Sequence, residues 1–125
     1  MTSWLLTAAA LIPLGWLTHE LSHVLAVWAT GGRVTAFAPY PHRHSGRWYF
    51  ARYACHYEAG EPAGARWRHA APLIKAGLLL PAWALLALLW TPLLFGVAVE
   101  VSEVAVWLWG YLLRRPGTDG ARFAG

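Results

Sequence analysis

The sequence feature that most constrains this chain is a polar turn, His19-Glu20-Leu21-Ser22-His23, set within an otherwise apolar run from Trp4 to Thr30. On a helix, residues four positions apart share one face and lie about 6 Å apart along the axis, so His19 and His23 can bind the same metal ion. Glu20 lies beside that face. Because each ionisable side chain in a lipid-embedded helix costs roughly 2.5 kcal/mol or more, the turn requires a compensating partner or a function.

The composition places this turn in a membrane protein rather than a soluble one. Of the 125 residues, 58% are hydrophobic and only 13% are charged, which is too apolar for a soluble domain of this size. Many of the nine Trp residues fall near the ends of apolar runs, where indole rings favour the lipid interface. The net charge of +4 comes mostly from Arg residues flanking these runs, which indicates anionic lipids and no nucleic acid as partner. We expect a single membrane-embedded domain over residues 1–125, with the lipid bilayer as its surroundings.

Three apolar runs predict a mainly α membrane protein with three transmembrane helices. The runs cover about residues 4–30, 70–90 and 93–113, and a tail follows over residues 114–125. Each run is long enough to cross a hydrocarbon core of about 30 Å. Gly31 and Gly32 end the first run, and Pro92 separates the second from the third. Lys75 is expected to extend from the start of the second span toward the interface. A cleaved signal peptide is not expected, since the first run leads directly into the polar turn.

Between the first two spans the pattern changes from helical to alternating. Strand-like runs cover residues 34–38 and 48–54, with His42-Arg43-His44-Ser45-Gly46 as a polar turn between them. This pattern predicts a β-hairpin over about residues 33–57, lying at or dipping into the membrane interface. The histidines of its turn are expected to be exposed. Residues 58–68 are rich in Gly and Pro and predict a loop.

Basic residues indicate how the chain is oriented in the membrane. They gather between the first and second predicted spans and after the third, and in a three-span chain both segments lie on the same side. These residues are Arg33, Arg43, Arg47, Arg52, Arg66, Arg68, Arg114, Arg115 and Arg122. By the positive-inside rule that side is the cytoplasm. We therefore expect a multi-pass protein of the cell (inner) membrane, with its N-terminus outside, its C-terminus cytoplasmic and the polar turn inside the membrane.

The polar turn has the arrangement of a zinc-binding helix. Two neutral imidazoles, from His19 and His23, are suited to hold Zn²⁺, and Glu20 is placed to take a proton from a water molecule. A catalytic zinc normally has three protein ligands, so a third must come from elsewhere in the chain. Asp119 in the tail and Glu103 in the third span are both candidates, and their depth in the membrane does not choose between them.

Each of these residues also has a purely structural interpretation. The polar turn can face a helix interface, with its His and Glu side chains hydrogen-bonded to one another. Asp119 can belong to an ordinary Asp-Gly turn. Glu100 and Glu103 can pair with Lys75 or form a hydrogen bond between helices.

Four segments of the chain resemble one family, the site-2 protease group of intramembrane zinc metalloproteases. They are His19-Glu20-Leu21-Ser22-His23 in a membrane span, Gly31-Gly32-Arg33-Val34 after it, Ala71-Pro72 opening the next span, and Asp119-Gly120-Ala121-Arg122 near the end. The resemblance implies a three-span core with a membrane-associated hairpin after the first core helix. It also implies that an Asp-Gly motif supplies the third zinc ligand, which favours Asp119.

Two functional hypotheses follow. The leading one is an intramembrane zinc metalloprotease that hydrolyses peptide bonds in or near transmembrane segments of membrane proteins. In it Glu20 is the catalytic residue and His19, His23 and Asp119 hold the metal, with Glu103 as the alternative third ligand. The other is a non-catalytic membrane adaptor or pseudoprotease of the same fold.

Overall fold

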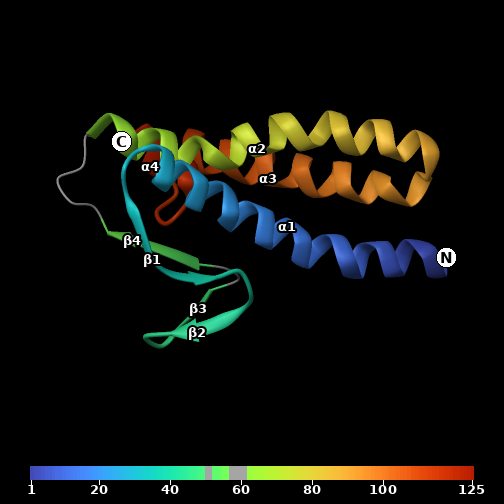
Figure 1. The fold of residues 1–125 in the computed structure, drawn as a ribbon, viewed down its shortest axis with the longest axis horizontal. Helices are drawn as coiled ribbons and strands as arrows, with labels where there is room; N and C mark the ends of the chain where they lie inside the picture. The colour runs from blue at the N-terminus through green and yellow to red at the C-terminus, as the bar shows by residue number, and fades with distance from the viewer. Residues whose placement is uncertain (50–51, 57–61) are drawn as a thin grey trace.

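Three long helices lie side by side in the computed structural model, which describes residues 1–49, 52–56 and 62–125 (Figure 1). They are α1 (Thr2–Ala29), α2 (Pro62–Leu89) and α3 (Leu94–Leu113), and they confirm the three helices predicted from the apolar runs. The chain reverses direction between α2 and α3 through a short 3₁₀ helix, η1 (Thr91–Leu93). Because α1 and α3 run in the same direction, the end of α1 and the end of α3 lie at the same end of the bundle.

The second helix begins earlier than the sequence predicts. Residues 62–68 belong to α2, so the loop predicted over residues 58–68 is wrong from Pro62 onward, and residues 58–61 lie outside the described residues. Proline is compatible with this position, since the first turn of a helix does not use its backbone N–H groups and the ring holds φ near the helical value. The earlier start carries Arg68 and His69 into the helix bundle.

Two helical segments, Arg66–Leu89 and Thr91–Leu113, are long and apolar enough to cross a membrane. Only 17% of the most apolar stretch of the first and 22% of that of the second is buried within the chain. Large apolar side chains point outward instead, among them Leu78 (71% exposed), Leu88 (82%) and Leu112 (71%). An exposed apolar surface of this extent is stable in contact with lipid rather than water. The first helix is not in this set, because the His19–His23 turn lowers its mean hydropathy.

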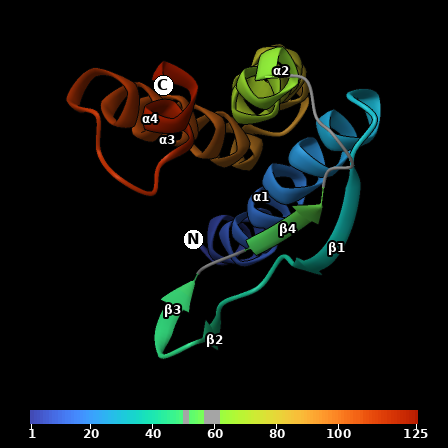
Figure 2. The ribbon, with the colours of Figure 1, turned by 90° about the vertical axis from the view of Figure 1, so that its left-hand side faces the viewer.

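The predicted β-hairpin is present, in two parts. Strands β1 (Arg33–Ala38) and β4 (Arg52–His56) pair antiparallel, and so do the short strands β2 (His42–His44) and β3 (Arg47–Tyr49). The register sets Ala36 opposite Ala54, and the ladder is irregular between Val34 and Ala36. Seen along the helices, the strands lie beside α1 on the side opposite α2 (Figure 2). Residues 50, 51 and 57 of the predicted hairpin lie outside the described residues.

The turn of the hairpin is shorter than the sequence predicts. His42, Arg43 and His44 form strand β2 rather than a turn. The reversal needs only Ser45 and Gly46, which both have positive φ values, 49° and 78°. Two successive residues with positive φ form the tight turn whose twist matches that of antiparallel strands, so the preceding residues remain free to pair.

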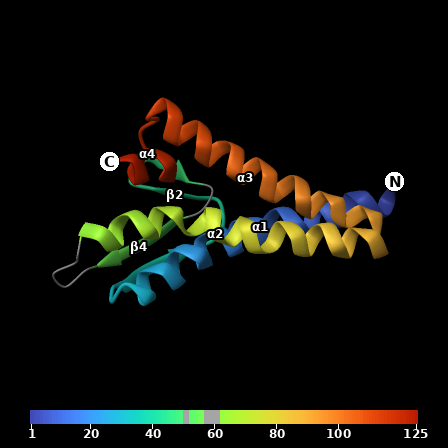
Figure 3. The ribbon, with the colours of Figure 1, turned by 90° about the horizontal axis from the view of Figure 1, so that it is seen from above.

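The tail folds back onto the bundle instead of extending from it. Arg114 ends α3 in the left-handed conformation, and Gly117 (φ 85°) reverses the chain. Thr118 then caps a short helix, α4 (Asp119–Ala124), by accepting a hydrogen bond from the Ala121 N–H. Seen from above, α3 diverges from α2 toward this end, and α4 occupies the space between them (Figure 3). The predicted tail over residues 114–125 therefore contains an ordered helix.

Gly120 makes this close packing possible. A Cβ atom at Gly120 would collide with the backbone of Trp107 and Tyr111 on α3, whereas a Cβ at Gly77 on α2 would meet no heavy atom within 4 Å. The neighbours of Gly120 are backbone atoms, which cannot move aside as a flexible side chain would. The position of Asp119 in the bundle thus depends on the absence of a side chain at the next residue.

We expect Gly120→Ala to lower the free energy of unfolding by about 1–3 kcal/mol, because α4 must move away from α3. Gly77→Ala is the matched control and should be neutral or raise stability by up to about 1 kcal/mol, since alanine favours the interior of a helix. Unfolding of both variants by heat or denaturing detergent measures the difference. Equal stability of the two variants would show that α4 does not pack as described.

Candidate metal centre

His19 and His23 bring two ring nitrogens together on one face of α1. They lie one helical turn apart, and their Nε2 atoms are 3.3 Å from each other. His23 is 1% exposed, whereas the side chain of His19 is 27% exposed and borders a cavity. The two imidazoles predicted as metal ligands from the spacing of the polar turn therefore converge.

Asp119 completes a triangle with these two rings. Its Oδ2 atom lies 3.1 Å from Nε2 of His23 and 3.6 Å from Nε2 of His19. A tetrahedral zinc ion with bonds of about 2.0–2.1 Å has ligand atoms about 3.3–3.4 Å apart. The three observed separations bracket that value. Among the described residues, these three side chains form the only group of His, Cys, Asp or Glu spaced to hold a metal ion.

Hydrogen bonds on the far side of each ring determine which nitrogen faces the centre. Nδ1 of His23 donates to the backbone carbonyl of Arg68 at 2.8 Å, and Nδ1 of His19 donates to Oε1 of Glu103. A carbonyl or a carboxylate only accepts, so each neutral ring carries its hydrogen on Nδ1. Both Nε2 lone pairs then point toward the Asp119 carboxylate. Three electron-rich atoms at these distances repel one another unless a proton or a metal cation lies between them.

Glu103 occupies a different place from Asp119. It contacts Nδ1 of His19, the nitrogen that points away from the triangle, and its other oxygen pairs with Lys75. The two candidates for third ligand are therefore separated by position: Asp119 faces the Nε2 atoms, and Glu103 lies behind one ring. Proteins commonly place a carboxylate behind a metal-binding histidine in this way.

His69 belongs to the site and was not found by sequence reasoning. Its Nδ1 atom lies 2.9 Å from Oδ1 of Asp119, the carboxylate oxygen that does not face His23. The backbone carbonyl of His69 accepts a hydrogen bond from the indole of Trp107 at 2.7 Å. No motif connects His69 with Asp119 in the sequence. The available signal was an imidazole at the start of the second apolar run, at the same predicted membrane boundary as the tail.

The Asp119 carboxylate is held in its ionised form. Burial by itself would raise the pKa of Asp119, but the contacts with the rings of His19, His23 and His69 outweigh burial and hold this pKa well below its usual range. Asp119 therefore offers a negatively charged oxygen at neutral pH, which is the form that binds a metal ion.

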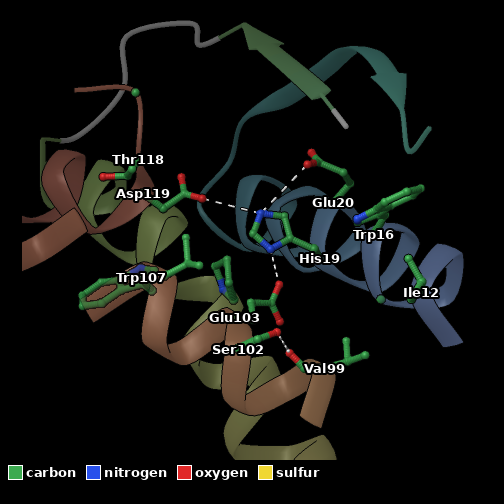
Figure 4. Close-up of a pocket in the computed structure, with 14 residues that line it drawn as sticks. Ile12, Trp16, His19, Glu20, Val99, Ser102, Glu103, Trp107, Thr118 and Asp119 are labelled. Carbon is green, nitrogen blue, oxygen red and sulfur yellow. Dashed lines mark hydrogen bonds and ion pairs between the residues drawn. The ribbon is translucent and has the colours of Figure 1, made fainter. Parts of the chain in front are cut away.

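Glu20 lies beside the triangle, at the wall of a cavity of about 550 Å³ between α1 and α3. The residue is 5% exposed, and its Oε1 atom is 3.9 Å from Nε2 of His19. Its Oε2 atom is buried and has no hydrogen-bond partner among the described residues. Figure 4 shows Glu20 and Asp119 approaching the His19 ring from different sides, with Glu103 below it at the other ring nitrogen. A buried carboxylate oxygen without a partner is costly, so this atom is available for a bound molecule.

Lys75 does not extend to the membrane interface as predicted. It lies thirteen residues into α2, about 20 Å from the helix start, and its side chain is 9% exposed. Its ammonium group pairs with Glu100 at 3.0 Å and also with Glu103. The expectation of a solvent-seeking lysine is wrong because α2 begins at Pro62, which places Lys75 deep in the bundle opposite two carboxylates. The alternative pairing of Glu100 and Glu103 with Lys75 is confirmed.

Comparison of the chain with protein-family models, with curated proteins and with solved structures gave no match. The function is therefore inferred from the chemistry and geometry of the site.

We expect the purified protein to bind zinc at a ratio of one ion per chain, because the three ligand atoms have the spacing of a zinc tetrahedron. Loss of a group that only supports a ligand weakens metal binding roughly 10- to 100-fold. His23→Ala removes a ligand itself, so it should weaken zinc binding by more than that. His44→Ala, which removes an exposed histidine of β2, is the control and should bind as the original protein does. Competition with a chromogenic chelator measures the affinities. Equal zinc binding by the two variants would rule out this site.

Proposed function

We propose that the chain is an intramembrane zinc metalloprotease that resembles the site-2 proteases. The observation that carries the proposal is the triangle of His19, His23 and Asp119, with spacings of 3.1–3.6 Å and the buried carboxylate of Glu20 beside it. A purely structural polar turn would need its groups to satisfy one another. Here two Nε2 atoms and one oxygen of Asp119 converge, and the Oε2 atom of Glu20 beside them has no hydrogen-bond partner among the described residues.

The donor set favours zinc over other common metal ions. Calcium and magnesium prefer shells made of oxygen atoms, whereas two imidazoles and one carboxylate are a common catalytic zinc set. Three protein ligands also leave one tetrahedral position for water, and the cavity is lined by His19, Glu20 and Asp119. When bound, zinc would polarise the scissile carbonyl and activate a water molecule.

Glu20 is the general base in this proposal. Its carboxylate, with Oε1 3.9 Å from Nε2 of His19 and Oε2 without a partner among the described residues, is placed to accept a proton from a water molecule at the triangle. The same carboxyl group then donates that proton to the amine that leaves when the peptide bond breaks. The hydrogen bonds to Arg68 and Glu103 put the hydrogen of each neutral imidazole on Nδ1, which leaves both Nε2 atoms for a metal ion and Glu20 as the group that moves the proton.

The cavity is suited to an apolar peptide segment. Besides the site residues its lining is mostly apolar and includes Ile12, Trp16, Val99, Val106 and Trp107, with Ser102 and Thr118 as polar members. Such a wall offers few hydrogen bonds, so it binds side chains that are themselves stable in lipid. We propose that the substrate is a transmembrane segment of another membrane protein. Because a helix keeps its carbonyl groups in its own hydrogen bonds, the substrate must unwind locally before its peptide bond can be attacked.

The proposal includes three membrane spans, with α1 as the first. Outward-facing apolar residues such as Leu5 (65% exposed) and Leu25 (60%) support contact of α1 with lipid. Its polar turn faces α3 and α4 through Glu103 and Asp119, so its ionisable groups are shielded by protein. By the positive-inside rule, the flanking Arg residues support a cytoplasmic location for the hairpin and α4 and an outside location for the N-terminus.

We expect Glu20→Gln to bind zinc as the original protein does but to cleave membrane substrates about 10²- to 10⁴-fold more slowly, because the amide cannot accept the proton. Cleavage of a panel of single-span membrane proteins in detergent, followed by mass spectrometry, measures the rate. His44→Ala should cleave at the original rate. Undiminished cleavage by Glu20→Gln would contradict the assigned role, and stoichiometric zinc without cleavage of any substrate would favour a non-catalytic adaptor of this fold.

A further inference from the structure

A second cluster of ionisable side chains lies directly behind His19. It consists of Lys75 on α2 and of Glu100 and Glu103 on α3. The side chains of Glu100, Lys75 and Glu103 are 2%, 9% and 16% exposed, so all three are largely removed from solvent. Through Glu103 the cluster reaches His19, and it therefore connects α1, α2 and α3 at one level of the bundle.

The cluster contains one carboxylate more than a structural ion pair requires. Lys75 and Glu100, with 3.0 Å between Nζ and Oε2, already form a complete pair between α2 and α3. Glu103 adds a second buried negative charge, which is unfavourable among apolar helices unless another group stabilises it. Its two oxygens are divided between two partners: Oε2 pairs with Lys75, and Oε1 accepts the hydrogen from Nδ1 of His19.

We propose that Glu103, anchored by Lys75, is a positioning residue that holds the His19 ring in the orientation that binds metal. This inference rests on the proposed zinc site. Lys75 fixes one oxygen of Glu103, and the other oxygen then fixes both the rotation of the His19 ring and the position of its hydrogen.

The two histidines differ in how much they need such support. His23 is 1% exposed, and the backbone carbonyl of Arg68 fixes its Nδ1 atom. The side chain of His19 is 27% exposed on the cavity side, where close packing cannot restrict its ring. The orientation of His19 therefore depends on Glu103 more than that of His23 depends on any side chain.

The formal charges of the cluster also suit a divalent cation. Lys75 cancels one of the two glutamates, so the cluster carries one net negative charge next to His19. Asp119 contributes one more negative charge at the triangle. Together with the Glu20 carboxylate beside the triangle, these charges attract a divalent ion in a region of low dielectric, where an unbalanced charge is strongly disfavoured.

The test compares Glu103→Ala with Glu100→Ala as matched variants. Each removes one carboxylate from the same lysine and changes the charge of the cluster equally, but only Glu103 touches His19. We expect Glu103→Ala to weaken zinc binding about 10- to 100-fold and to alter the visible absorption spectrum of the cobalt-substituted protein. Glu100→Ala should leave both nearly unchanged. Equal effects of the two substitutions on zinc affinity and on the cobalt spectrum would overturn the inference.

Conservative variants keep the test valid if an alanine variant does not fold. Glu103→Gln retains an oxygen for the Nδ1 hydrogen of His19, so it should bind zinc more tightly than Glu103→Ala and more weakly than Glu100→Gln. Equal affinities of Glu103→Gln and Glu100→Gln would contradict the positioning role. Zinc binding by the unsubstituted protein distinguishes the two proposals. If it binds no zinc, the proposed function fails as well. If it binds zinc normally but the Glu103 and Glu100 variants have equal effects, only the positioning role of Glu103 fails.

Discussion

The structure depends on the requirement that polar groups buried among apolar helices must find partners within the chain. The His19–His23 turn places two imidazoles in the second half of α1, where apolar packing cannot satisfy their polar nitrogens. Each remaining helix supplies one partner: α2 the carbonyl of Arg68, α3 the carboxylate of Glu103, and α4 the carboxylate of Asp119. The arrangement of the helices and the arrangement of the site are consequences of the same contacts.

The short helix α4 determines the position of Asp119, although it has only six residues. It fills the space where α3 diverges from α2, and it does so because Gly120 allows backbone to approach backbone. The Thr118 cap and the hydrogen bond from His69 then fix the direction of the Asp119 side chain. Asp119 is thereby fixed through both its backbone and its carboxylate.

The sequence predicts those parts of the structure that depend on local periodicity or on a spacing within one element. The helical runs, the antiparallel hairpin and the shared face of His19 and His23 are of this kind. The roles of Asp119 and Glu103 could not be separated, because both lie at suitable depths and only the packing of α4 against α3 decides which one meets the Nε2 atoms. The predicted position of Lys75 is wrong, and the contact of His69 with Asp119 is not predicted, because the start of α2 at Pro62 changes the depth of both residues. A single proline in the sequence does not reveal whether it opens a helix or interrupts a loop.

In the proposed site, two imidazoles and one carboxylate bind a single zinc ion within the helix bundle. X-ray absorption at the zinc edge, on purified protein loaded with one equivalent of zinc, measures the ligands of that ion. We expect a four-coordinate shell of two imidazole nitrogens and oxygen atoms, with distances of about 2.0–2.1 Å. A shell without imidazole scattering, or one that contains sulfur from Cys55, would contradict it.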